Sequence, residues 1–127
     1  MRIEERVLEN KLTRGLTITE IHAIVAVGYR ESNPMNVVAA RLGVTLATLT
    51  TTAARLEEKG YVVRTRDESD RRKVLISLTT RGREVFRAHG LFHKHMVQSA
   101  LSGLSEEEQE VLARSLAQVK GFFDEQA

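Results

Sequence analysis

Residues 36–60 read NVVAARLGVTLATLTTTAARLEEKG, and this stretch decides the fold. It predicts a short helix over 36–42 that ends at Gly43, because glycine readily adopts the left-handed conformation that closes a helix. Thr45 is a suitable N-cap for a second helix over 46–59. Two helices joined by a turn of about three residues form a helix-turn-helix unit.

The second helix has two unlike faces. Leu49, Ala53 and Leu56 repeat at offsets of four and three residues, so we expect them to face the core. The opposite arc carries mostly small or hydroxyl-bearing side chains, namely Ala47, Thr48, Thr51, Ala54 and Arg55, with Thr50 at its flank. A slim face of this kind suits a helix that enters a DNA major groove, although any amphipathic helix can show the same pattern.

A hairpin follows the second helix. The segments 61–66 and 73–78 are rich in β-branched residues and predict two strands, with turn-forming residues over 67–70 between them. Five cations gather on this ribbon: Arg64, Arg66, Arg71, Arg72 and Lys73. Such a cluster directly after a helix-turn-helix indicates a wing that binds DNA phosphates and places one arginine in the minor groove.

Two side chains of the ribbon form a candidate pair. Asp70 and Arg72 lie two residues apart, so they share one face of the strand. The carboxylate can then hold the guanidinium in the rotamer that inserts into the groove. The alternative interpretation is a surface ion pair, which contributes less than about 1 kcal/mol to stability.

Apolar periodicity predicts further helices on both sides of this core. We expect them over 2–12, over 20–28 with Thr19 as N-cap, from Thr79 to about Leu101, and from a capping box at 105–108 to about Phe123. Residues 31–34 are expected to form a polar turn. The predicted fold is mainly α with a small β-hairpin wing (α+β), that is, a winged helix-turn-helix.

The composition narrows the class of protein. The 127 residues suffice for one domain, and the lack of cysteine excludes disulfides and thiolate metal sites. The apolar runs are short, and the N-terminus lacks the apolar region of a secretory signal, so we expect no membrane segment and a cytoplasmic location. Without a phosphate loop, glycine-rich fingerprint or nucleophile–base pair, we expect no enzyme and no catalytic residue.

Charge is unevenly distributed along the chain. Residues 36–83 carry ten basic and five acidic side chains, whereas residues 84–127 carry four basic and seven acidic ones. A basic middle segment beside an acidic tail indicates one surface that meets a polyanion.

Four segments together resemble the MarR family of bacterial regulators: 37–45, 56–62, 70–72 and 78–83. The resemblance implies a homodimer on a pseudo-palindromic operator. It also implies one domain over 1–127, with a winged-helix core over about 19–83 and dimerisation helices over 1–12 and 84–127. The expected DNA-binding residues are Thr45, Leu46, Thr48, Thr50, Thr51, Arg55, Arg66, Asp70, Arg71, Arg72 and Lys73.

The expected base-facing surface favours A·T-rich DNA. It has no Asn or Gln and only Arg55 late in the helix, so bidentate readout of guanine or adenine is scarce. Threonine methyl groups and Leu46 can pack on thymine methyl groups, while the hydroxyls bind phosphates. We therefore expect an A·T-rich palindrome, with Arg72 in a narrow minor groove.

A narrower resemblance concerns the effector. Residues 44–51 and 89–97 are similar to the subset of the family that represses bacterial fatty-acid synthesis genes. This implies a repressor that responds to long-chain acyl groups delivered on acyl carrier protein. The expected effector-binding residues are His22, His89, Phe92, His93 and Met96.

Several alternatives stay open. His89 and His93 have the i, i+4 spacing of zinc ligands, but no carboxylate or thiol lies close in sequence, so we expect no metal and no other cofactor. His22 lies among apolar residues and is typical of a satisfied core histidine or a pocket-lining one. The whole chain is alternatively a winged-helix protein-interaction module, or a MarR-type regulator of a different small ligand or metal.

Overall fold

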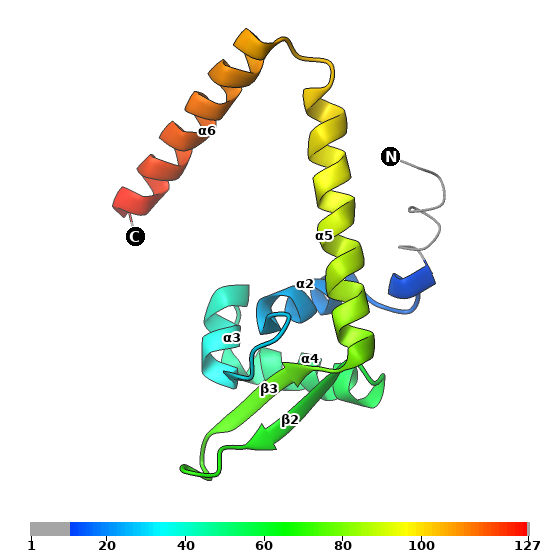
Figure 1. Cartoon of the computed structure of the whole chain (residues 1–127). Coiled ribbons are helices and arrows are strands. Elements are labelled where there is room, and N and C mark those ends of the chain that lie inside the picture. Colours follow the sequence, from blue (N-terminus) through cyan, green and yellow to red (C-terminus); the bar gives the residue numbers. More distant parts are fainter. Residues whose placement is uncertain (1–10, 127) are drawn as a thin grey trace. The chain divides into compact units, whose positions relative to one another are not determined.

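The computed structural model describes residues 11–126 and shows a mainly α chain with one small sheet (Figure 1). Its elements are α2 (Ile18–Val27), β1 (Asn33–Pro34), α3 (Met35–Leu42), α4 (Leu46–Glu58), β2 (Val62–Arg66), β3 (Val74–Leu78), α5 (Thr80–Leu101) and α6 (Glu106–Gln126). They confirm the predicted α+β winged helix-turn-helix. The helix expected over 2–12 lies almost entirely outside the described residues.

The described residues form two compact units that divide within α5, between Phe92 and His93. The core of the first unit lies between α2, α3, α4, the sheet and the first turns of α5. Its most completely buried large side chains are Ile24, Val27, Val38, Leu49, Leu56, Val62, Ile76 and Val85. Ala53 is buried with Leu49 and Leu56, which confirms the predicted inner face of the second helix.

α3 and α4 form the predicted helix-turn-helix. Gly43 ends α3 with a φ of 76°, and the Thr45 side chain accepts the backbone N–H of Thr48 at the start of α4. The two helices are bent by 103° relative to each other. No single helix in the described part of the chain is long and apolar enough to cross a membrane. Within that part, only α3 and α4 taken together have the length and apolar composition of a membrane span, and their apolar side chains lie in the core of the first unit.

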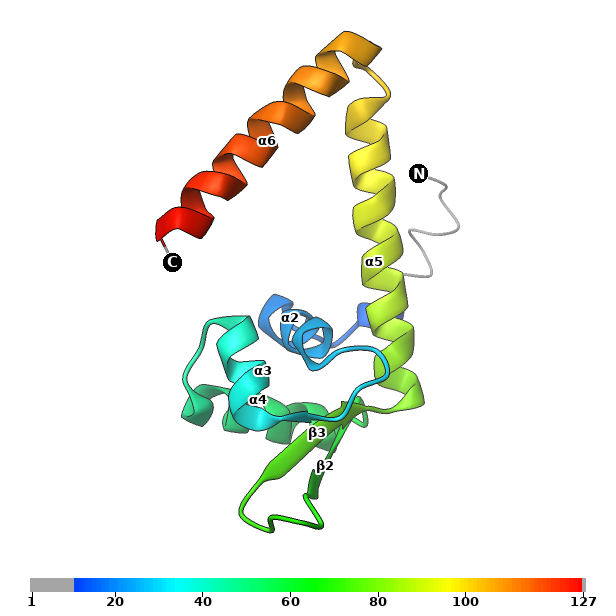
Figure 2. The same cartoon turned by 60° about the vertical axis from the view of Figure 1, so that its left-hand side comes forward.

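The sheet has three antiparallel strands in the order β1-β3-β2. Figure 2 shows β2 and β3 side by side in the hairpin. β2 and β3 form the predicted hairpin, with Arg66 opposite Val74 beside the turn, while β1 pairs on the other edge with Asn33 opposite Ile76. The polar turn expected over 31–34 is therefore wrong for its last two residues. A two-residue edge strand is too short to show a period in sequence, and its partner strand lies about forty residues away.

The N-cap of α2 is Thr17 and not the expected Thr19. The Thr17 hydroxyl accepts the N–H of Glu20 at 3.1 Å, and the Glu20 carboxylate accepts the N–H of Thr17 at 2.8 Å. These two bonds form a capping box, which satisfies two N–H groups that the first helical turn leaves without partners. The Thr-x-x-Glu spacing was present in the sequence, and it outweighs the local preference of Thr19.

The second unit contains the end of α5 and the whole of α6. Ser105 accepts the N–H of Glu108 at 3.1 Å and donates its own N–H to the Glu108 carboxylate at 2.9 Å, which confirms the predicted capping box. These bonds, chiefly the one from the Ser105 backbone, hold the pKa of Glu108 below its usual value. The large apolar side chains of α6 are 38–65% exposed: Val111, Leu112, Leu116, Val119, Phe122 and Phe123.

Candidate nucleic-acid interface

The outer face of α4 is the first part of the candidate interface. All of its predicted residues are exposed: Thr45, Leu46, Ala47, Thr48, Thr50, Thr51, Ala54 and Arg55. Thr52, which the sequence reasoning did not place, is buried on the inner side, where its hydroxyl donates to the carbonyl of Thr48 at 3.1 Å. A hydroxyl bonded back to its own helix is compatible with a buried position, so burial of Thr52 leaves no polar atom unpaired.

The threonine hydroxyls on this face are also bonded to the helix. Thr50 donates to the carbonyl of Leu46 at 2.8 Å, and Thr51 donates to that of Ala47 at 3.3 Å. With their protons directed to the helix, these residues present methyl groups and acceptor lone pairs to the outside. The Thr48 hydroxyl accepts that of Thr45 at 3.0 Å, and the expectation that hydroxyls on this face bind phosphates stays a prediction.

The second part of the interface is the wing, which comprises β2, β3 and the intervening residues 67–73. Its turn is closed by backbone bonds between Asp67 and Lys73, at 2.9 Å, and between Lys73 and Asp70, at 3.0 Å. The Asp67 carboxylate accepts the backbone N–H and the hydroxyl of Ser69, at 2.9 and 2.8 Å. The bond from the Ser69 backbone is the main reason that the pKa of Asp67 lies below its usual value.

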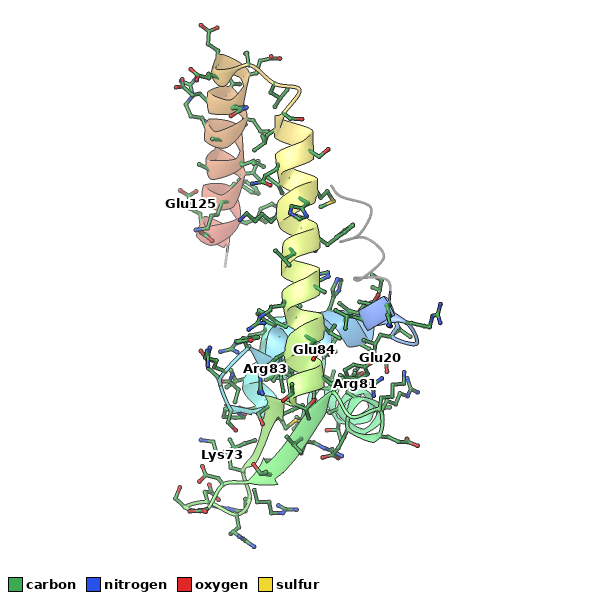
Figure 3. All side chains as sticks on the ribbon, turned by 45° about the vertical axis from the view of Figure 1, so that its right-hand side comes forward. Glu20, Lys73, Arg81, Arg83, Glu84 and Glu125 are labelled. Atoms are coloured by element: carbon green, nitrogen blue, oxygen red, sulfur yellow. The ribbon has the colours of Figure 1, made fainter. Side chains whose placement is uncertain are left out.

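Asp70 and Arg72 make the contact that their spacing predicted. The Asp70 carboxylate accepts the backbone N–H of Arg72 at 3.1 Å and its Nε at 3.4 Å. The Arg72 side chain is nevertheless 94% exposed, so it projects from the wing while one of its nitrogens is held. Arg66 has a different contact, because its guanidinium donates to the carbonyl of Arg71 at 2.8 Å and braces the turn. Figure 3 shows Lys73 on the outer part of the hairpin.

Arg64 does not belong with the cations of the wing tip. Its backbone N–H and guanidinium bind Glu57 in the last turn of α4, at 2.9–3.3 Å. The side-chain hydrogen bond from Arg64 is the main cause that holds the pKa of Glu57 below its usual value. No sequence pattern indicated this pair, since the two residues belong to different elements and the strand period does not show which way Arg64 points.

The two parts of the interface border one cleft of about 610 Å³. It is lined by Met35, Asn36, Leu46, Thr50, Arg64, Asp70, Arg72, Lys73 and Val74. Five of these were predicted to bind DNA from the sequence, namely Leu46, Thr50, Asp70, Arg72 and Lys73. Met35 and Asn36 were not predicted, and they reach the cleft because the first turn of α3 lies beside the wing.

The expected effector residues divide between the two units. His22 on α2 is exposed and not a core residue, because the apolar neighbours in sequence point to the other side of the helix. Its ring meets that of His89 edge to face, with the centroids 6.0 Å apart, so the first unit brings these two together. Phe92 is half-buried on the next turn of α5, and His93 and Met96 belong to the second unit. Among the described residues no group of three His, Asp or Glu is arranged to hold a metal ion.

The amino-acid sequence is similar to those of several transcriptional regulators. A sequence profile of the MarR family matches residues 16–74. The transcriptional repressor MdtR of Bacillus subtilis is 30% identical over 107 residues, which make up 84% of this chain and 69% of MdtR. The transcriptional regulator SarZ of Staphylococcus saprophyticus is 39% identical over 70 residues, or 55% of this chain. The chain spans about half of the length of SarZ (48%).

Solved structures extend the likeness to nearly the whole chain. Streptococcus pneumoniae FabT in complex with DNA is similar over 98% of this chain and 92% of FabT, with a TM-score of 0.83 and 37% identity. The transcriptional regulator SlyA is similar over 95% of this chain and 89% of SlyA, with a TM-score of 0.71 and 27% identity. SarZ, MdtR and SlyA are all named as transcriptional regulators or repressors. On the matches to MdtR and FabT, the chain belongs to the MarR family of transcriptional regulators.

Proposed function

We propose that this chain is a homodimeric repressor that binds an A·T-rich, pseudo-palindromic operator. The observation that carries the proposal is the shared cleft of about 610 Å³, which Leu46 and Thr50 of α4 line together with Arg72 of the wing. A helix of this slimness enters a major groove, and the wing reaches the adjacent minor groove of the same duplex. The proposed contacts are those of the predicted DNA-binding set.

The chemistry of α4 supports A·T preference. Thr50 and Thr51 offer methyl groups outward, since their hydroxyl protons are bonded to the helix. Methyl groups pack on the C5-methyl of thymine in the major groove. A·T-rich minor grooves are narrow and strongly negative, which favours an exposed guanidinium such as that of Arg72.

The dimer is supported by the second unit. Exposed apolar side chains follow α6 at helical spacing, and a row from Leu112 through Leu116 and Val119 to Phe123 forms one stripe. Water-exposed stripes of this extent are normally covered, and a two-fold partner covers them with the same stripe. We assign dimerisation to this part of the domain, within the range 84–127, and to the N-terminal segment 1–12.

The proposed effector is a long-chain acyl group carried by acyl carrier protein, and the proposed targets are fatty-acid synthesis genes. The sequence resemblance of residues 44–51 and 89–97 supports this, as does the 37% identity to FabT. The contact between His22 and His89 supports a common site on α2 and α5. The other residues that we assign to effector binding are Phe92, His93 and Met96.

The experiment that tests DNA binding is fluorescence anisotropy with an A·T-rich duplex and a G·C-rich duplex of equal length at two salt concentrations. Binding should favour the A·T-rich duplex and fall steeply with salt, because each phosphate contact releases counterions. Equal and salt-independent binding to both duplexes, or none, favours the protein-interaction module instead. Addition of acyl carrier protein, with and without an acyl chain, then tests the effector.

A further inference from the structure

One ion pair joins the recognition helix α4 to the wing. The carboxylate of Glu57 accepts three hydrogen bonds from Arg64: the backbone N–H at 3.0 Å, Nη2 at 2.9 Å and Nε at 3.3 Å. The two side chains are 37% and 26% exposed, so the pair is partly shielded from water. A carboxylate that binds both the backbone and the guanidinium of one residue fixes the strand as well as the side chain.

The position of β2 at the edge of the sheet explains how the contact between Glu57 and Arg64 holds the wing. β2 is an edge strand, paired only with β3, so alternate N–H groups point away from the sheet. Glu57 binds the outward N–H of Arg64, two residues before the strand ends at Arg66. The last turn of α4 therefore holds the wing on the side that faces the recognition helix.

Arg64 lines the same cleft as Arg72, but the two differ in what holds them. The guanidinium of Arg64 is bound to a carboxylate by two of its nitrogens, whereas that of Arg72 is held by Nε alone and is 94% exposed. A cation that is already paired in this way has less to gain from a phosphate.

We propose that Glu57 is a positioning residue for DNA binding, which acts through Arg64 to set the distance between the recognition helix and the wing. With this distance fixed, Arg72 reaches the minor groove while α4 lies in the major groove. Arg64 itself is then withheld from the DNA backbone. This inference rests on the proposed DNA-binding function.

The test is a double-mutant cycle between Glu57→Gln and Arg72→Ala, measured as operator affinity at fixed salt. Arg72→Ala should weaken binding by roughly tenfold in the wild-type background, as expected for loss of one groove contact. In the Glu57→Gln background the same change should cost less than about threefold, because the wing no longer presents Arg72 correctly. The matched control is Glu58→Gln, which removes the same charge from the next, exposed residue of α4. It should leave the tenfold loss unchanged.

Substitutions of Arg64, the partner of Glu57, give a second and independent test of the positioning role. Arg64→Lys keeps the positive charge but loses the two-nitrogen contact, so it should weaken binding as Glu57→Gln does. In the Arg72→Ala background, Arg64→Gln should leave the slope of log affinity against log salt unchanged, whereas a phosphate contact by Arg64 would lower the slope by about 0.9. Thermal unfolding of each variant checks that it is folded.

The outcomes distinguish the positioning role of Glu57 from the proposed DNA binding. If wild type binds the operator and Arg72→Ala costs the same with and without Glu57→Gln, the positioning role is refuted while DNA binding stands. A salt slope that Arg64→Gln lowers further in the Arg72→Ala background, or wild-type affinity in Arg64→Lys, refutes it too. Failure of the wild type to bind any duplex refutes the proposed function itself.

Discussion

At the scale of single residues, the wing presents Arg72 differently from Arg64 and Arg66. Arg64 and Arg66 are bound to Glu57 and to the carbonyl of Arg71, whereas Arg72 is 94% exposed and held by Asp70 through Nε. An arginine whose backbone and Nε are fixed has fewer rotamers to lose when it enters a groove. Arg72 is therefore the residue on which we expect wing binding to depend most.

Replacing Arg72 by alanine should reduce operator affinity by about tenfold or more and lower the salt slope, because a charged groove contact is lost. Replacing Thr48 by alanine should instead change which bases are preferred and lower affinity less, since the methyl group of Thr48 faces the major groove in the proposed complex. Selection of preferred sequences for both variants distinguishes the two effects. Equal losses on every sequence for both would contradict this division of roles.

A second residue-scale feature is the first turn of α5. Thr79 caps this helix, accepting the N–H of Gly82 at 3.1 Å and donating its own N–H to the carbonyl of Tyr61 at 3.1 Å. The helix therefore lies directly on the start of the hairpin. A side chain at Gly82 would overlap the carbonyl oxygen of Tyr61, which explains the glycine after Thr79-Thr80-Arg81 in the sequence.

Gly82→Ala should lower the free energy of unfolding by about 2 kcal/mol or more, because the overlap involves backbone that cannot move aside. Gly90→Ala is the matched control, since it lies in the same helix with nothing within 4 Å of the added carbon. It should raise the free energy of unfolding by up to about 1 kcal/mol through helix propensity. Chemical denaturation measures both, and equal effects would show that the approach of α5 to Tyr61 is not tight.

At the scale of elements, the end of α4 is anchored to the start of α2. The Lys59 ammonium donates to both carboxylate oxygens of Glu20 at 2.9 Å and to the carbonyl of Gly15 at 2.9 Å. Glu20 is only 3% exposed. Burial opposes its ionisation, but the hydrogen bonds from Thr17 and Lys59 outweigh burial and hold the pKa of Glu20 below its usual value of 4.5.

This lowered pKa predicts how stability responds to acid. A group that binds protons less tightly in the folded state stabilises the fold at pH above its unfolded pKa, here 4.5, and the contribution disappears as pH falls through the folded pKa. Glu20→Gln should cost about 1–2 kcal/mol at pH 7 and flatten the loss of stability below pH 4.5. Glu84→Gln, on an exposed carboxylate of α5, should leave the pH profile of urea unfolding as in wild type. If wild type and Glu20→Gln showed the same dependence of stability on pH, the ionisation of Glu20 would not contribute to the stability of the fold.

At the scale of the whole molecule, α6 carries a row of exposed apolar side chains. Leu116 is 60% exposed and Phe123 is 65% exposed, and both lie on the stripe that we assign to the dimer. The double variant Leu116→Asp with Phe123→Asp should be monomeric, since buried unpaired charges oppose association. Ala117→Asp, on the opposite side of α6, should remain dimeric. Sedimentation equilibrium decides between these outcomes.

The double variant Leu116→Asp with Phe123→Asp should bind an operator with two half-sites at least about tenfold more weakly than wild type. In a dimer, binding of one subunit to its half-site raises the effective concentration of the other subunit at the second half-site. The affinity of the double variant for a single half-site should be unchanged, since α4 and the wing are left intact. A double variant that stays dimeric would place the dimer contacts elsewhere in the chain.

The sequence by itself determined the helix-turn-helix, the hairpin and the helices that follow it. Thr45, Gly43 and the stripe of Leu49, Ala53 and Leu56 act through local hydrogen bonds and helical period, so the helix-turn-helix was predictable within one residue. The same holds for the hairpin and for the contact between Asp70 and Arg72. That contact lies in the turn and not on a strand, because an aspartate carboxylate readily accepts the backbone N–H two residues further on.

Tertiary structure alone decided which cations face the outside. Whether Arg64 lies at the wing tip or against Glu57 depends on the path of β2 past α4, and no local period encodes it. The pairing of β1 with β3 and the burial of Glu20 beneath Lys59 are likewise set by segments that are distant in sequence. Local interactions specify elements, whereas contacts between elements depend on how the chain packs its core. The contact of Asp70 with Arg72 was therefore predictable, but the pair of Glu57 with Arg64 and the place of Met35 in the cleft were not.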